Sequence, residues 1–355
     1  MVTIRDVARE AGVSTATVSR VLNNVGPVDE ETRRHVTAVA RRLRYVPNAL
    51  GRGLSRRRTD AIGLLLPDLF GEFFSEVLRG SDQTAQQAHY HLVVSSSHNN
   101  KAEIRAALAM MRGRVDGLVI MSPHIDAETL NETLPHHLPL VLLNCFVQSA
   151  AFEALNIDNP AGAAAMTRHL LSHGHTRIAI IKGVEGNFEA ADRLRGYRDA
   201  LRGAGLHPDP ALAVAGDFSE ASGYDAIKLL LQTHPRPTAI FACNDSMAIG
   251  AMSALREAGV HVPQEMALAG FDDVPIASYL APALTTVHVG IHRLGVLAIE
   301  RLLKAVHQRD GPRRQQTVLP TSLRIRASCG CLGHPSLRNK DREEKEVING
   351  EGMSM

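Results

Sequence analysis

The stretch GVSTATVSRVLNN, residues 12–24, places hydroxyl groups, one alanine and one arginine where a helix should begin. Before it, apolar residues recur at helical spacing, namely Ile4, Val7, Ala8 and Ala11. Gly12 can take the left-handed conformation that ends a helix, and Ser14 can cap the next one. The sequence therefore predicts two helices joined by a tight turn, a helix-turn-helix.

The second helix should bury one apolar stripe and leave a polar face outside. We expect Val18, Val21 and Leu22 inside and the remaining positions outside: Thr15, Ala16, Ser19 and Arg20. Hydroxyls, an alanine methyl and an arginine suit base edges in the DNA major groove, whereas Ser14 and Thr17 suit phosphates. A third helix is predicted from Asp29 to about Arg44. A three-helix cap that binds protein or nothing is the alternative.

Charge is divided unevenly along the chain. Residues 1–60 contain 12 arginines, no lysine and 6 carboxylates, a charge of +6, which leaves −4 for the rest of a chain whose total is +2. A basic head on a mildly acidic body favours a polyanionic partner for the head. A solvated charged surface would also produce such a division.

Composition excludes several classes of protein. No apolar run approaches the roughly 18 residues of a membrane span, and the polar start lacks a secretory signal, so we expect a cytoplasmic protein. Four scattered cysteines favour reduced thiols. Cys329-Gly-Cys331 has no second Cys or His pair at zinc-site spacing, and His173 and His175 lack a clear ligand set. We therefore expect neither a metal site nor a cofactor.

From Ala61 onward, short apolar runs alternate with helical stretches. The runs are AIGLLLPD, HLVVSSS, DGLVIMS and LPLVLLN, followed by RIAIIKG, LAVAGDF, TAIFACND and MALAGFDD. This alternation predicts an α/β core of parallel sheets in two lobes, with ligands bound outside the carboxyl ends of the strands. The expected domains are an all-α helix-turn-helix domain (1–46), a hinge (47–60), a two-lobed core (61–330) and a disordered tail (331–355). The lobes span about 61–158 and 159–287, with crossovers near 288–325.

The sequence TIRDVAREAGVSTATVSRVLN, residues 3–23, followed by YVPNA, residues 45–49, resembles the amino terminus of the lactose/galactose repressor family of bacterial transcription regulators. The body resembles the effector-binding core of the same family, which is shaped like a periplasmic sugar-binding protein. The resemblance covers about residues 2–328. It implies a ligand-controlled repressor that binds a pseudo-palindromic operator as a homodimer, or as a tetramer, with no membrane partner.

The resemblance also implies DNA contacts. Thr15, Ala16 and Arg20 would read the operator half-site, and Leu54 of a hinge helix would wedge into the minor groove. The expected DNA-binding residues are Thr3, Ser14, Thr15, Ala16, Thr17, Ser19, Arg20, Asn23, Tyr45, Asn48, Ala49, Arg52 and Leu54. Gly51 and Gly53 depart from the family pattern, and each costs about 1 kcal/mol of helix stability relative to alanine. We therefore expect residues 47–58 to fold only on DNA.

Matching motifs in the core imply an effector site. Its expected residues are Asp68, Phe73, Phe74, Asn144, Arg193, Phe218, Asn244 and Asp272. Alternatives remain open: Asp245 could cap the next helix, Phe73 or Phe74 could belong to the core, and Arg193 could form a surface ion pair. Asn144 stands where some sugar-binding members carry a carboxylate, and TTVHVG replaces the usual TTVxQP. A sugar is the expected class of effector.

Other functions find less support. The sequence contains no G-x-S-x-G, P-loop or H-E-x-x-H motif, which argues against an enzyme. A transport protein would share the body but need an export signal and no helix-turn-helix. A core that docks a phosphocarrier protein stays open beside DNA binding. Whether an effector acts as inducer or corepressor is also open.

Overall fold

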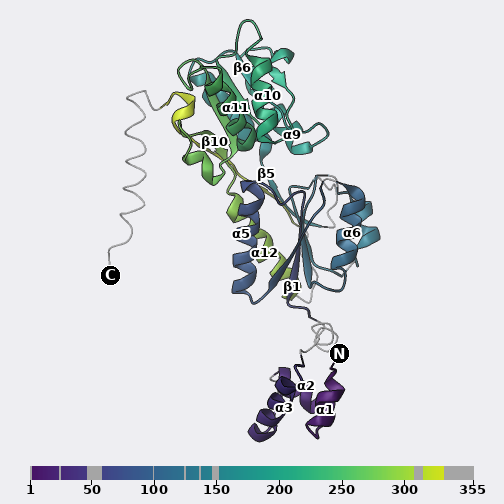
Figure 1. Ribbon diagram of the computed structural model, residues 1–355. Helices are drawn as coiled ribbons and strands as arrows, with labels where there is room; N and C mark the ends of the chain where they lie inside the picture. Colours follow the sequence, from purple (N-terminus) through teal and green to yellow (C-terminus); the bar gives the residue numbers. More distant parts are fainter. Residues whose placement is uncertain are drawn as a thin grey trace, which may run out of the picture. The chain divides into compact units, whose positions relative to one another are not determined.

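The computed structural model describes residues 2–23, 25–45, 58–98, 100–123, 125–135, 137–145, 152–307 and 315–331. The chain divides into two units, one of residues 1–60 with 113–116 and one of residues 61–112 with 117–355 (Figure 1). The predictions for the hinge helix, which concern Asn48, Ala49, Arg52 and Leu54, lie outside the described residues. So does the predicted disorder of the tail beyond residue 331.

The head contains helices α1 (Ile4–Glu10), α2 (Thr15–Asn23) and α3 (Glu30–Arg42). Gly12 has a φ of +66° and so ends α1 in the predicted left-handed conformation. The carboxylate of Asp29 accepts a hydrogen bond of 2.8 Å from the Thr32 amide, which caps α3. The helices bury a small apolar cluster of Val7, Ala8, Ala11, Val18, Val21, Val36, Val39 and Ala40.

The first lobe is built on a parallel sheet with the strand order β11-β5-β4-β3-β1-β2. Its strands are β1 (Ala61–Leu66), β2 (His91–Ser96), β3 (Gly117–Met121), β4 (Leu140–Leu143), β5 (Glu153–Ile157) and β11 (Gln316–Leu319). Its helices are α5 (Glu72–Gln87), α6 (Lys101–Met111), α7 (Ala127–Thr133) and α12 (Ile291–His307). Helices α5 and α12 lie side by side on one face, and α6 covers the other (Figure 1).

The second lobe has the strand order β12-β10-β9-β8-β6-β7. Its strands are β6 (Ile178–Ile181), β7 (Ala213–Val214), β8 (Ala239–Ala242), β9 (Ala267–Asp272), β10 (Thr285–His288) and β12 (Ser322–Arg324). Its α-helices are α8 (Asn159–Ser172), α9 (Phe188–Gly203), α10 (Glu220–Leu230) and α11 (Asp245–Glu257). Short 3-10 turns are η1 (Pro210–Leu212), η2 (Pro275–Ser278) and η3 (Ala327–Cys329). Strand β12 pairs antiparallel with β10, unlike the parallel pairs elsewhere.

Within its described part, the chain passes between the lobes after β5, after β10 and between β11 and β12. The last of these passages lies at the end of the crossover segment predicted near 288–325. Pro320 cannot donate to a strand ladder, and the segment splits there into two short strands of different sheets. The α/β fold class with parallel sheets and an all-α head is confirmed.

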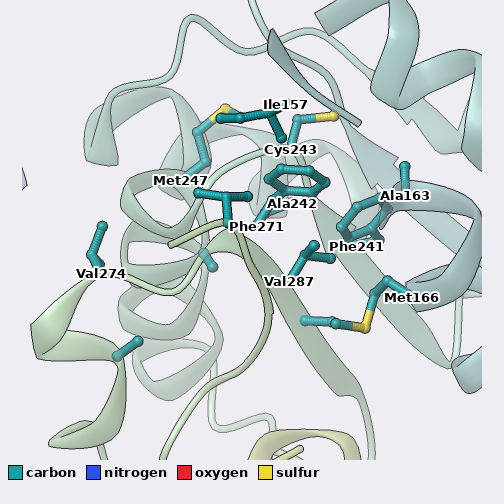
Figure 2. Close-up of a cluster of buried hydrophobic side chains, with 14 of the residues drawn as sticks. Ile157, Ala163, Met166, Phe241, Ala242, Cys243, Met247, Phe271, Val274 and Val287 are labelled. Carbon is teal, nitrogen blue, oxygen red and sulfur yellow. The ribbon is translucent and has the colours of Figure 1, made fainter. Parts of the chain in front are cut away.

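The core of the second lobe fixes the ends of its central strands. Ala163 and Met166 of α8 lie beside Phe241 of β8 and Val287 of β10 (Figure 2), and all four side chains are buried. Burying a large apolar side chain contributes roughly 1.5–3 kcal/mol to folding. The strand ends that carry polar residues are thus held by a close-packed interior. Among the described residues, no helix is long and apolar enough to cross a membrane.

Candidate functional site

The outer face of α2 carries the residues predicted to contact DNA. Ser14, Thr15, Ala16 and Arg20 are exposed, whereas Thr17 and Ser19 are half-buried. The Ser14 hydroxyl accepts a hydrogen bond of 3.1 Å from the Thr17 amide and so caps the helix. The Asn23 amide donates to the Ser19 hydroxyl at 3.1 Å, which orients both side chains along this face.

Two other predicted DNA-binding residues have structural partners. The backbone amide and hydroxyl of Thr3 both donate to the carboxylate of Asp6, at 2.9 and 2.7 Å. These hydrogen bonds favour the ionised carboxylate and lower the pKa of Asp6. Tyr45 packs half-buried against the apolar cluster of the head. Both residues therefore support the fold of the head, and their contact with DNA stays a prediction.

The arginines of the head differ in how they are paired. Arg34 Nε lies 3.6 Å from Glu30 Oε1, and Arg42 Nη2 lies 2.6 Å from Glu10 Oε1, so both arginines form ion pairs. Arg20 forms no ion pair with any described residue of the chain and is exposed. Its guanidinium can therefore bind an acceptor outside the protein without first breaking an ion pair.

In the core, the eight predicted effector residues line one cavity of about 280 Å³. The first lobe supplies residues that follow its strands: Asp68, Phe73, Phe74 and Asn144. The second lobe supplies Arg193, Phe218, Asn244 and Asp272. The cavity thus lies at the carboxyl ends of the strands of both lobes, as expected for open parallel sheets. Its size suits a small molecule.

Arg193 is held at the floor of this cavity. Its side chain is only 4% exposed, so the surface ion pair considered for it is excluded. Nε donates to the Asn159 side chain at 2.8 Å, and Nη1 donates to the backbone carbonyl of Cys243. The guanidinium also lies over the Phe271 ring, 3.8 Å from its centroid. These contacts fix the orientation of the fork that faces the carboxylates.

Two carboxylates share the charge of Arg193. Asp272 Oδ1 lies 3.4 Å from Nη1, and Glu189 Oε1 lies 3.9 Å from Nη2. Burial raises the pKa of Asp272 to about 7, and Arg193 offsets this only in part. Burial likewise raises the pKa of Glu189. The carboxyl group of Asp272 is therefore poised between its ionised and protonated forms near neutral pH.

The cavity holds buried polar atoms that make no hydrogen bond within the protein. Among the described residues, the buried side-chain atoms that make no hydrogen bond are Asn144 Nδ2, Asn156 Oδ1 and Asp272 Oδ1. The first and last line the cavity, one a donor and the other an acceptor of a hydrogen bond. Leaving such a group unsatisfied costs about 1–3 kcal/mol. Asn144 itself is fixed because its Oδ1 accepts from the Ile157 amide at 3.0 Å.

Asn244, not Asp245, caps α11. Its Oδ1 accepts from the Met247 amide at 2.9 Å, and its Nδ2 donates to the Phe218 carbonyl at 2.9 Å. Asp245 is fully buried and accepts hydrogen bonds from the Thr286 hydroxyl (2.6 Å) and from a backbone amide. The alternative that Asp245 caps the helix is therefore wrong, because its side chain points back into the lobe.

Aromatic side chains form the apolar walls. The Phe218 ring lies over Gly183, two residues after β6, where an added Cβ would overlap the ring and force it to move. Phe73 and Phe74 meet edge to face, with centroids 5.4 Å apart. Both are partly buried against the core and also line the cavity. For these two residues, core packing and cavity lining coexist.

The structure adds cavity residues that the sequence prediction omitted. Glu189, Asp217, Ser219 and Ser246 line the second-lobe side. Glu72 lines the opposite side and accepts a hydrogen bond of 2.9 Å from the Ile276 amide, which joins the two lobes. Each residue follows the carboxyl end of a strand, the signal that could have identified it. Whether any residue of the cavity binds a ligand stays a prediction.

Comparison with known proteins identifies the family of the chain. Residues 3–48 match the bacterial regulatory proteins of the lacI family, and residues 167–329 match the periplasmic binding protein-like domain. The HTH-type transcriptional repressor PurR of Edwardsiella ictaluri (strain 93-146) is 38% identical over 310 residues, which cover 86% of this chain and 91% of that protein. The chain belongs to the lacI family.

Other members of the lacI family agree over nearly the same length. The ribose operon repressor of Escherichia coli (strain K12) is 36% identical over 87% of this chain and 94% of its own length. The Lac repressor dimer bound to operator and the anti-inducer ONPF has a TM-score of 0.79 and 29% identity, covering 92% of this chain and 99% of that chain. A complex of the regulator CelR with cellobiose has a TM-score of 0.68 and 31% identity, covering 92% and 100%.

Membership of the lacI family confirms the predicted class of function. The chain is a DNA-binding transcriptional repressor with an effector-binding core, and its relatives are repressors rather than enzymes. The resemblance found at residues 3–23 and 45–49 is thereby confirmed as a family relationship.

Proposed function

We propose that this repressor binds a pseudo-palindromic operator as a homodimer in the bacterial cytoplasm, and that a small molecule in the cavity between the lobes controls its affinity for DNA. The observation that carries the proposal is a pair of buried atoms that make no hydrogen bond, Asn144 Nδ2 and Asp272 Oδ1, on opposite lobes of one cavity; Asp272 Oδ1 has only its ion pair with Arg193. A ligand that satisfies both atoms binds the two lobes together.

The proposed effector is a sugar or a sugar derivative. Ring hydroxyls both donate and accept, so they match the amide donor of Asn144 and the Asp272 acceptor, neither of which makes a hydrogen bond, and the fork of Arg193. The Phe218 ring offers an apolar face against which a sugar ring can stack. A relative named for the ribose operon and another in complex with cellobiose support the same class.

The proposed DNA contacts divide by chemistry. Thr15, Ala16 and Arg20 read base edges in the major groove, while Ser14 and Thr17 contact phosphates. In a dimer two such helices meet half-sites about one helical turn apart, so the operator mirrors the symmetry of the protein. The hinge residues Asn48, Ala49, Arg52 and Leu54 are proposed to complete the contact at the operator centre.

The proposed control is a two-state equilibrium of the core. A ligand that binds one arrangement of the lobes more tightly shifts the population toward it and changes how the paired heads reach DNA. Because the shift equals the difference in affinity for the two states, the same cavity serves an inducer or a corepressor.

Selection of DNA from a library of fully randomised duplexes tests the proposal, with sequencing as the readout and with a panel of sugars and nucleobases added singly. We expect one enriched symmetric site whose occupancy changes with one sugar. Enrichment that no compound alters would refute control through the cavity. An asymmetric site would refute the dimer.

A further inference from the structure

Two cysteines and two histidines that are distant in sequence meet in the second lobe. His169 lies in the last turn of α8, His173 directly follows that helix, and Cys329 and Cys331 flank the end of η3. His169 Nε2 lies 3.1 Å from the Cys331 sulfur and 3.5 Å from the Cys329 sulfur. The two sulfurs lie 2.8 Å apart. We call these four residues the Cys-His cluster.

The cluster is separate from the effector cavity. The Thr285 hydroxyl, at the start of β10, donates to the Cys329 sulfur at 3.1 Å. Asp272 of the cavity, at the end of β9, lies opposite His288 in the strand register, and His288 is at the other end of β10 from Thr285. Neither cysteine nor either histidine lines the cavity. The cluster is therefore a different place in the second lobe from the effector cavity.

The ligand atoms are close enough to share one ion. The available ligand atoms of His169, His173 and Cys331 all lie within 4.8 Å of one another, and Cys329 stands beside them. Two thiolates and two imidazoles are the donor set of tetrahedral structural zinc sites. Sulfurs held about 2.3 Å from a tetrahedral zinc would stand about 3.8 Å apart. Binding would therefore separate the sulfurs slightly from their present distance.

His173 is oriented as a metal ligand. Its Nδ1 lies 2.8 Å from the backbone carbonyl of His169. A carbonyl oxygen can only accept, so Nδ1 carries the proton and Nε2 keeps its lone pair. An outer hydrogen bond from the second ring nitrogen to a carbonyl is the usual support of a metal-binding histidine.

The two cysteines of the cluster are buried, whereas His169 is half-buried and His173 is exposed. Cys329 and Cys331 are 2% and 0% exposed. Burial raises the pKa of Cys331, so its thiolate needs a nearby cation to form. Burial also lowers the pKa of His169 to about 4, which keeps the ring neutral and able to donate its lone pair. A bound divalent ion would replace the thiol protons and supply the missing charge.

We propose that Cys329, Cys331, His169 and His173 bind one Zn²⁺ ion that ties the carboxyl-terminal segment of the core to α8. The segment η3 already packs against β9 and β10 (Figure 1), so the ion would link the helix layer to the strand layer of the second lobe. This proposal departs from the expectation of no metal site, which stays untested. The histidine pair has the i, i+4 spacing of a helix face, but its cysteine partners come some 160 residues later.

Metal loading of the full-length protein tests the proposal directly. The protein is kept under a non-thiol reductant, stripped with a chelator, dialysed against zinc and assayed by elemental analysis. We expect one tightly bound zinc per chain. Replacement by Co²⁺ should give thiolate-to-cobalt charge-transfer bands and the intense visible bands of tetrahedral cobalt. Wild-type protein without stoichiometric zinc and without these bands would overturn the proposal.

Variants assign the site. Cys331→Ser and His169→Gln should lose the zinc and the cobalt bands, whereas His91→Ala, an exposed histidine of the other lobe, should keep both. Retention of zinc by the double variant Cys329→Ser/Cys331→Ser would place the ion elsewhere and refute the assignment. With zinc at a hundredfold excess over Kd, the wild-type Tm should rise by roughly 5–10 °C, and the variants should show no rise. An unchanged wild-type Tm would contradict a structural role.

Discussion

The carboxyl group of Asp272 lowers the stability of the folded protein near neutral pH, although it is placed to bind a ligand. Its side chain is buried, its Oδ1 has no hydrogen bond, and burial raises its pKa to about 7 from an ordinary value of 3.8. Between these two values the folded protein holds a proton that the unfolded chain has released. Stability contributed by this group is therefore present below about pH 4 and is lost as the pH rises toward 7. A side chain that lowers the stability of the fold in this way suits a binding role.

Asp272→Asn should separate the two demands. The amide keeps the shape but not the charge, so the ligand-free variant should melt at or above the wild-type temperature at pH 8 and show no such gain at pH 4. Binding of the sugar found by the DNA selection should weaken about 5- to 12-fold, because the amide oxygen of asparagine still accepts a hydrogen bond but lacks the charge. Calorimetry at both pH values and sugar titration measure this. Loss of both stability and sugar affinity at pH 8 would contradict this prediction. The control is Asp225→Asn, on the exposed face of α10.

Arg20 makes a different prediction, because it is exposed and forms no ion pair with a described residue. Arg20→Ala should cost about 1–3 kcal/mol of operator binding and relax the preference at one symmetric base pair. Arg34→Ala, which removes an exposed arginine paired with Glu30 on α3, should change binding far less and without sequence preference. Competition titrations with single-base operator variants decide. An equal loss across all operators would show that Arg20 contacts only the backbone of the DNA.

At the scale of elements, neighbouring helices approach until their backbones touch. In the second lobe, Gly250 of α11 faces the Glu220 carbonyl of α10, and Gly223 of α10 faces the backbone of Met247. A Cβ at either glycine would overlap the opposite helix. The same arrangement joins α5 to α12 through Gly80 and Gly295 in the first lobe. These contacts fix the helix layer that in turn holds the strand ends.

Gly250→Ala should therefore destabilise the core by about 1–3 kcal/mol, the usual cost of an overpacked contact. The control is Gly203→Ala at the end of α9, where nothing lies within 4 Å of the added methyl. That change should be neutral or add up to about 1 kcal/mol, because alanine favours helix. Chemical denaturation of both variants gives the comparison. If Gly250→Ala proved as stable as Gly203→Ala, the helices would have to move apart without cost.

The elements also show what a sequence can predict. Apolar runs bounded by polar residues identified β1, β9 and most of the strands, and family motifs at their ends identified residues that do line the cavity. Periodicity could not tell that Asn244 caps α11 while Asp245 turns inward, since both suit a cap. Such choices depend on a partner from a distant strand, here Thr286.

At the scale of the whole core, the described part of the chain passes between the lobes after β5, after β10 and between β11 and β12, and contacts across the cavity also join the lobes. Glu72 of the first lobe accepts a hydrogen bond of 2.9 Å from the Ile276 amide of the second. Sequence reasoning missed this contact, because a glutamate in the first turn of a helix is adequately explained by the helix dipole. Its partner is a backbone group 204 residues away.

Removing this contact should alter the ligand response without touching DNA chemistry. Glu72→Ala loses the acceptor, so the arrangement of the lobes in this structure becomes less favourable by about 0.5–1.5 kcal/mol, and the affinity for a sugar that binds this arrangement should fall roughly 2- to 12-fold. Glu72→Gln keeps an acceptor oxygen at the same position and should restore most of the affinity. Sugar titration of both variants measures the effect, with operator binding in the absence of ligand as the reference. A glutamine variant as weak as the alanine variant would show that Glu72 acts by its charge within the cavity rather than by joining the lobes.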